Sequence, residues 1–152
     1  MNNAVLKYLI ISGLLVGAIL GIIAGVPYIG GIALFSTLFL CAPVVMVLLI
    51  MAGKFDLTTT KDSIVGGAAV GFCANIAFSF SYSIVNAILF LTIKYTTNYV
   101  LTAIIMNSPI WLLILIVFFI GVLTATTNAF SGFVTYYVIN LIRDLYEKKH
   151  YE

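Results

Sequence analysis

The stretch Gly13-Leu14-Leu15-Val16-Gly17-Ala18-Ile19-Leu20-Gly21-Ile22-Ile23-Ala24-Gly25 has a glycine at every fourth position, inside an uncharged apolar run from Tyr8 to Val26. In water, each interior glycine would weaken a helix by about 1 kcal/mol relative to alanine. In hydrocarbon the helix forms regardless, because every backbone N–H and C=O has to be paired within the segment. The four glycines share one face, where they leave a groove for a second helix backbone. The stretch therefore predicts a transmembrane helix with a glycine-zipper (GxxxG-type) packing face.

The composition of the whole chain also indicates a membrane protein. Of its 152 residues, 63% are hydrophobic and 8% are charged, whereas soluble domains carry about 25% charged residues. Apolar runs of roughly 20 residues or more, the length that crosses a bilayer, cover about 8–26, 32–52, 63–93 and 109–142. We predict one all-α domain over residues 1–152 with four transmembrane helices. A net charge of +2 does not favour nucleic-acid binding.

The last two runs are longer than a bilayer requires, and the second contains a proline. Tilting absorbs part of the extra length, and the remainder would stand above the membrane as a helical hairpin with residues 94–107 at its tip. Pro43 removes one backbone hydrogen bond and predicts a bend near the middle of the second span.

The basic residues predict the orientation of the chain. With four spans, the N-terminus, the loop between Gly53 and Asp62 and the C-terminal tail lie on one side, and only Lys94 lies on the other. Positively charged loops stay in the cytoplasm, so we expect a multi-pass protein of the cell membrane with both termini cytoplasmic. The residues on the cytoplasmic side are Lys7, Lys54, Lys61, Arg143, Lys148 and Lys149.

The third run carries a second row of small residues at a spacing of four. Such a row is typical of close helix packing in membranes, so we expect it to pack against the glycine row of the first span. The alternative is that one of the rows faces another subunit. The row comprises Ser63, Gly67, Gly71, Asn75, Ser79 and Ser83.

Polar residues of the last two spans form the candidate polar path. In the fourth span they occupy one stripe at helical spacing, and the two asparagines of the third span share a face. One interpretation is a path or site for a neutral solute. The other, which we favour, is hydrogen bonding between helices, at about 0.6 kcal/mol per bond. The residues concerned are Asn75, Asn86, Thr124, Asn128, Ser131 and Thr135.

No ionisable side chain lies well inside a span, which does not favour a proton-coupled carrier.

Cys41 and Cys73 should lie at similar depths, as buried thiols or as a pair. His150 sits in a charged tail. We find no pattern for a nucleophile with its base, for a metal site or for a phosphate-binding loop, and expect neither enzymatic activity nor a cofactor.

The first half of the chain resembles a group of small archaeal and bacterial membrane proteins that have no assigned activity. The resemblance covers roughly residues 7–75. It rests on a glycine-spaced first helix ending in Gly25-Val26-Pro27, on Cys41, and on Asp62 followed by Gly66, Gly67 and Gly71. It implies a topology and no functional residue.

These observations predict a structural or interaction protein of the lipid bilayer, an accessory or self-assembling component that packs with its own copies or with another membrane protein. The alternative is a channel or facilitator for a neutral or small solute, lined by the candidate polar path.

Overall fold

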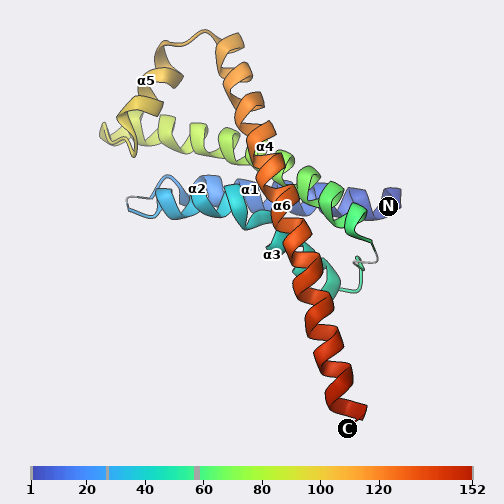
Figure 1. The fold of residues 1–152 in the computed structure, drawn as a ribbon. Coiled ribbons are helices and arrows are strands. Elements are labelled where there is room, and N and C mark those ends of the chain that lie inside the picture. The colour runs from blue at the N-terminus through green and yellow to red at the C-terminus, as the bar shows by residue number, and fades with distance from the viewer. Residues whose placement is uncertain (1, 27, 57–58, 152) are drawn as a thin grey trace.

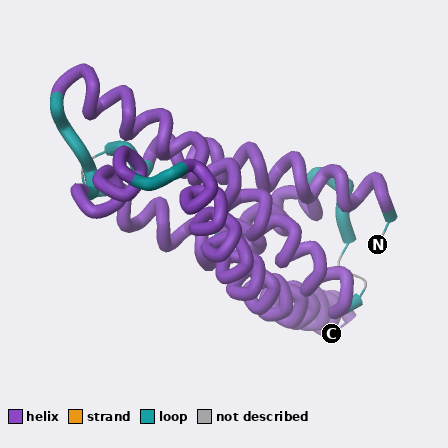
Figure 2. Tube along the Cα trace, turned by 90° about the horizontal axis from the view of Figure 1, so that it is seen from above, coloured by secondary structure: helices purple, strands orange, loops and turns teal. Residues whose placement is uncertain are grey.

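The computed structural model describes residues 2–26, 28–56 and 59–151, and within these ranges it contains helices and no strands (Figure 2). The all-helical class predicted from the sequence is confirmed. The helices, in chain order, are α1 (Asn3–Ile23), α2 (Gly30–Phe39), α3 (Cys41–Met51), α4 (Thr60–Ile93), α5 (Tyr99–Asn107) and α6 (Ile110–Tyr151).

Three of these helices, α1, α4 and α6, are long and apolar enough to cross a membrane. The pair α2 and α3 passes the same test only when taken together, and it is bent by 67° at the break between them. The described residues thus contain three helices that could span a membrane, or four if the bent pair counts as one. The bend expected at Pro43 is present, but it lies at Leu40, where the helix is interrupted.

The glycine row of α1 lies against the backbone of α4. A Cβ atom built on Gly17 would lie 2.1 Å from the carbonyl oxygen of Ala74, and one on Gly21 would lie 2.5 Å from that of Phe78. Gly13 meets the backbone of Val70 in the same way, whereas Gly25, which follows the end of α1, meets the side chain of Val85. Residue numbers rise together on both helices, so α1 and α4 run parallel.

The sequence led us to expect that the small-residue row of α4 packs against the glycine row of α1. This prediction is wrong, because the row lies against α6. A Cβ atom on Gly67 would lie 2.3 Å from the carbonyl oxygen of Asn128, and one on Gly71 would lie 2.5 Å from that of Thr124. The numbers run in opposite directions, so α4 and α6 are antiparallel. Each row therefore meets a different surface, and α4 lies between α1 and α6.

The main apolar core forms where α3 packs between α1 and α4. Leu9 of α1, Val45 and Met46 of α3 and Val70 of α4 are all fully buried there. Figure 1 shows α1, α2 and α4 running alongside one another while α6 crosses them steeply. The C-terminal part of α6 extends away from the other helices.

Several boundaries differ from those predicted. Helix α1 ends at Ile23, and Pro27, which was expected to stop it, lies outside the described residues. Helix α5 was not predicted, and α6 continues past Ile142 to Tyr151. At the end of α4, Lys94 adopts a left-handed conformation with φ of 54°, which closes the helix.

Candidate functional site

The side chain of Asn128 on α6 bridges the break between α2 and α3. Its Oδ1 accepts a hydrogen bond from the backbone N–H of Ala42 at 2.8 Å. Its Nδ2 donates to the carbonyl oxygens of Leu38 at 2.8 Å and of Thr37 at 3.0 Å. In an unbroken helix, the N–H of Ala42 would bind the carbonyl of Leu38 directly. The amide of Asn128 is inserted between these two groups and pairs with both.

The local sequence explains why the helix breaks at this point. Pro43 has no N–H, so the carbonyl of Phe39 loses its helical donor. A second side chain of α6 also reaches the break, because Thr127 Oγ1 donates to the carbonyl of Leu38 at 2.6 Å. Asn128 itself is fully buried, and an unpaired amide or carbonyl would be expensive there. Side chains of α6 therefore bind three backbone groups at the break, the N–H of Ala42 and the carbonyls of Thr37 and Leu38.

The two asparagines of α4 bind two different helices. Asn75 Nδ2 donates to the carbonyl of Val117 on α6 at 3.1 Å. Asn86 Nδ2 donates to Thr102 Oγ1 on α5 at 2.8 Å, and Thr102 in turn bonds Thr96 at 2.7 Å. The Oδ1 of Asn86 is buried and has no hydrogen-bond partner among the described residues. The middle of α4 is therefore bonded to α6, and the C-terminal part of α4 is bonded to α5.

The hydroxyls of the candidate polar path on α6 bind their own helix. Thr124 Oγ1 donates to the carbonyl of Ile120 at 2.8 Å. Ser131 Oγ donates to that of Thr127 at 3.0 Å, and Thr135 Oγ1 to that of Ser131 at 2.7 Å. Ser63 on α4 donates its hydroxyl hydrogen to the carbonyl of Gly132 on α6. The members of the predicted set therefore take part in several separate contacts.

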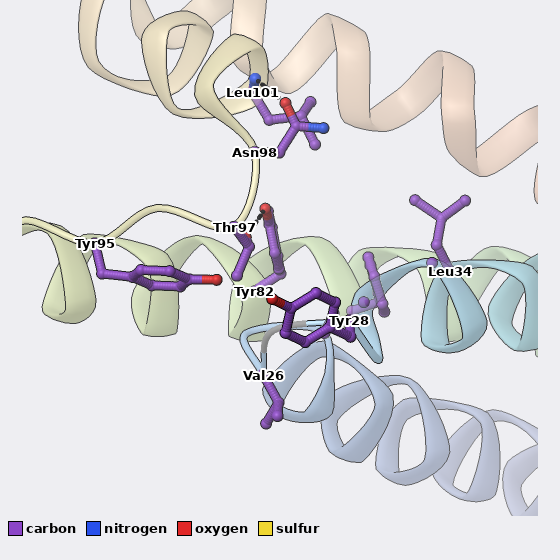
Figure 3. A pocket seen from close by; sticks show the side chains of 12 residues that line it. Val26, Tyr28, Leu34, Tyr82, Tyr95, Thr97, Asn98 and Leu101 are labelled. Carbon is purple, nitrogen blue, oxygen red and sulfur yellow. Dashed lines mark hydrogen bonds between the residues drawn. The ribbon is translucent and has the colours of Figure 1, made fainter.

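Two members of the set, Asn75 and Thr124, do border a cavity of about 390 Å³ between α2, α4, α5 and α6. A second cavity of about 330 Å³ lies beside it, where the connections α1–α2 and α4–α5 meet (Figure 3). Sequence reasoning missed Tyr82, which borders both cavities. The available signal was the spacing of four between Phe78 and Tyr82, which places two aromatic side chains on one face of α4.

Comparison with models of protein families, with curated proteins and with solved structures found no match to this chain. The resemblance of residues 7–75 to small archaeal and bacterial membrane proteins stays a prediction.

No group of three or more His, Cys, Asp or Glu side chains gathers among the described residues; the side chain of His150 lies outside them. Cys41 and Cys73 are free thiols, the first buried and the second half-buried. This arrangement of side chains can hold helices together and can hold an uncharged molecule in a cavity.

Proposed function

We propose that this chain is a structural, non-catalytic protein of the cell membrane, a helix-packing component that assembles with its own copies or with another membrane protein. The observation that supports this proposal best is the use of the intramembrane asparagines. Asn75, Asn86 and Asn128 all donate to groups on other helices. In hydrocarbon, such bonds fix which helices meet and in what register.

The proposal includes a topology of four spans, with α2 and α3 together forming one broken span. Both termini would then be cytoplasmic, as the distribution of basic residues predicts. The glycine row of α1 acts in this arrangement as a small-residue packing face, because its helix backbone approaches that of α4 closely.

The C-terminal part of α6 supports an interaction role. Leu141, Ile142 and Leu145 are each about 60% exposed, and they lie next to the charged residues Arg143 and Asp144. Exposed apolar side chains among charged ones lie beyond the hydrocarbon core, where a partner or the membrane surface has to cover them.

The alternative, a facilitator for a neutral solute, has one observation in its favour: Asn75 and Thr124 border the larger cavity. Vesicle swelling distinguishes the two functions. Purified protein is reconstituted into liposomes, and the rate of swelling in glycerol or urea is measured against protein-free liposomes. We expect equal rates. Swelling that is faster than in empty liposomes, and that is lost in Asn75→Leu, would contradict the structural proposal.

Self-assembly is measured in the same liposomes by energy transfer between donor-labelled and acceptor-labelled copies. Transfer above that of an unrelated monomeric membrane protein, at equal density, is the result expected for a self-assembling component. Its absence, together with solute-dependent swelling, would favour the facilitator.

A further inference from the structure

The two cavities are adjacent and share part of their lining. Four residues border both of them, and they come from three different helices: Leu34 of α2, Phe78 and Tyr82 of α4, and Leu101 of α5. Asn75 of α4 is hydrogen-bonded to Val117 of α6, and beyond this contact the two helices diverge. The larger cavity lies between the diverging parts of α4 and α6. Its volume of about 390 Å³ lies in the range of roughly 300–1,000 Å³ that is usual for small-molecule sites.

The linings of the two cavities differ in polarity. The larger cavity is bordered mainly by aliphatic side chains of α5 and α6, among them Ile104, Ile105, Leu113, Ile116 and Ile120. Hydroxyl and amide groups border both cavities, but a larger share of the surface of the smaller one is polar. Figure 3 shows Tyr82, Tyr95, Thr97 and Asn98 around it, with the hydroxyl of Tyr82 hydrogen-bonded to that of Thr97 at 2.7 Å. The pair of cavities therefore has a more apolar member, the larger one, and a more polar member, the smaller one.

No charged residue is among the described side chains that border either cavity. A phosphate, carboxylate or ammonium group would lose its hydration there without gaining an opposite charge, which is strongly unfavourable. A neutral head with hydroxyl groups, in contrast, would find donors and acceptors in Tyr82, Thr97 and Asn98.

The position of the smaller, more polar cavity matches the way an amphiphile lies in a bilayer. It is formed by the segments that follow α1 and α4, at the end of the molecule that carries Tyr28, Tyr95 and Tyr99. Aromatic residues of this kind are typical of the membrane–water interface. The larger, more apolar cavity lies along the inside of α6, toward the middle of the span at Thr124.

We propose that the two adjacent cavities together bind a neutral single-chain amphiphile, with its chain between α4 and α6 and its uncharged hydroxyl head against Thr97 and against Tyr82, which borders both cavities. This binding site goes beyond the proposed structural function and does not depend on it. The chain occupies the larger cavity, and the head exchanges hydrogen bonds with the hydroxyls at the interface.

Photolabelling with a monoacylglycerol that carries a photoreactive group on its chain tests the proposal. The probe is added to the full-length protein in liposomes, and labelled peptides are mapped by mass spectrometry. We expect labels on α5 and on the N-terminal part of α6, and we expect excess unlabelled monoacylglycerol to remove them. A fatty-acid probe with the same chain, ionised at pH 9, should label these peptides much less. Equal labelling by the fatty acid would overturn the neutral head.

Two substitutions separate the cavity from general contact with lipid. Ser79→Leu places a larger side chain at the border of the larger cavity and should abolish most of the labelling. Thr92→Leu, on an exposed part of α4 where the hydroxyl bonds only Ile88 of its own helix, is the matched control and should leave it unchanged. If the Ser79→Leu variant were labelled as strongly as the Thr92→Leu variant, the labels would come from probe in the bulk lipid. That result would overturn the proposed site.

Tyr82→Phe tests the head without filling the cavity, because it removes only a hydroxyl. Losing one such hydrogen bond should weaken binding of the monoacylglycerol roughly threefold to tenfold. The wild-type protein provides a measurement that needs no variant. Monoacylglycerol should raise its unfolding temperature in a concentration-dependent way, and a temperature that does not move at saturating concentrations would contradict the proposal.

Discussion

Asn128 and Ala42 lie 86 positions apart in the sequence, and the Oδ1 of Asn128 accepts a hydrogen bond from the backbone N–H of Ala42 at 2.8 Å. The same amide donates to the carbonyl of Leu38, the group that Ala42 would bind in an unbroken helix. The backbone carbonyl of Asn128 packs against Gly67 of α4. One residue of α6 thus joins the broken helix α2–α3 to α4.

Gly17→Ala should destabilise the protein by about 2 kcal/mol, in the range typical of overpacking. The added Cβ atom would lie 2.1 Å from the carbonyl oxygen and 2.6 Å from the Cα atom of Ala74, and both are backbone atoms that cannot rotate away. The free energy of unfolding in mixed micelles measures the effect.

The matched control is Gly31→Ala on α2, because a Cβ atom there meets nothing within 4 Å. Removing a helical glycine at an open position should stabilise the protein by about 0.5–1 kcal/mol. Equal effects of Gly17→Ala and Gly31→Ala would show that the close approach of α1 and α4 does not stabilise the fold.

Asn86→Ala should release α5 from α4 without unfolding the protein. The Nδ2 of Asn86 donates to Thr102 on α5, and this bond joins the short helix to the rest of the molecule. Amide hydrogen exchange in residues 99–107 should become faster, while exchange in α1 stays the same. Asn107→Ala is the control, since its Nδ2 bonds only the carbonyl of Ala103 on its own helix and its side chain is exposed. Unchanged exchange in Asn86→Ala would contradict this role.

Hydrophobic length and spacing predicted the helical class and the positions of the three long helices, because both signals are local. A spacing of four also placed Gly13, Gly17 and Gly21 on one face of α1. The sequence did not predict which helix each row contacts. A spacing of four shows that the small residues share one face, but it does not show toward which neighbouring helix that face is turned. The row of Gly67 and Gly71 was accordingly assigned to the wrong neighbour.

The interruption at Leu40 and the separate helix α5 depend on contacts that are distant in the sequence. Pro43 indicates a bend, but the position of the break also depends on Asn128, which supplies the missing hydrogen bonds from α6. Helix α5 consists of only nine residues, too few to form a helix alone, and it is held by Asn86 of α4. The residues of the candidate polar path could be chosen from the sequence because they are polar side chains in apolar helices. Their hydrogen-bond partners could not be predicted, because those partners are distant in the sequence.

Cysteine labelling tests the proposed topology. Ala52→Cys at the end of α3 and Tyr99→Cys at the start of α5 are both exposed. In intact cells, a membrane-impermeant maleimide should label Tyr99→Cys and should label Ala52→Cys only after the membrane is opened. The wild-type protein gives the background from Cys41 and Cys73. Labelling of Ala52→Cys from outside would reverse the orientation.

The free energy of unfolding of Asn128→Ala, measured beside Thr126→Ala, tests most directly whether the buried polar residues hold the helices together. Thr126 is the matched control because it is exposed on the same helix and bonds only its own turn at Val122. Asn128→Ala removes hydrogen bonds to Ala42, Thr37 and Leu38, which at about 0.6 kcal/mol each predicts a loss of about 2 kcal/mol. Thr126→Ala should change stability by less than about 0.5 kcal/mol. Equal stabilities of the two variants would contradict the account.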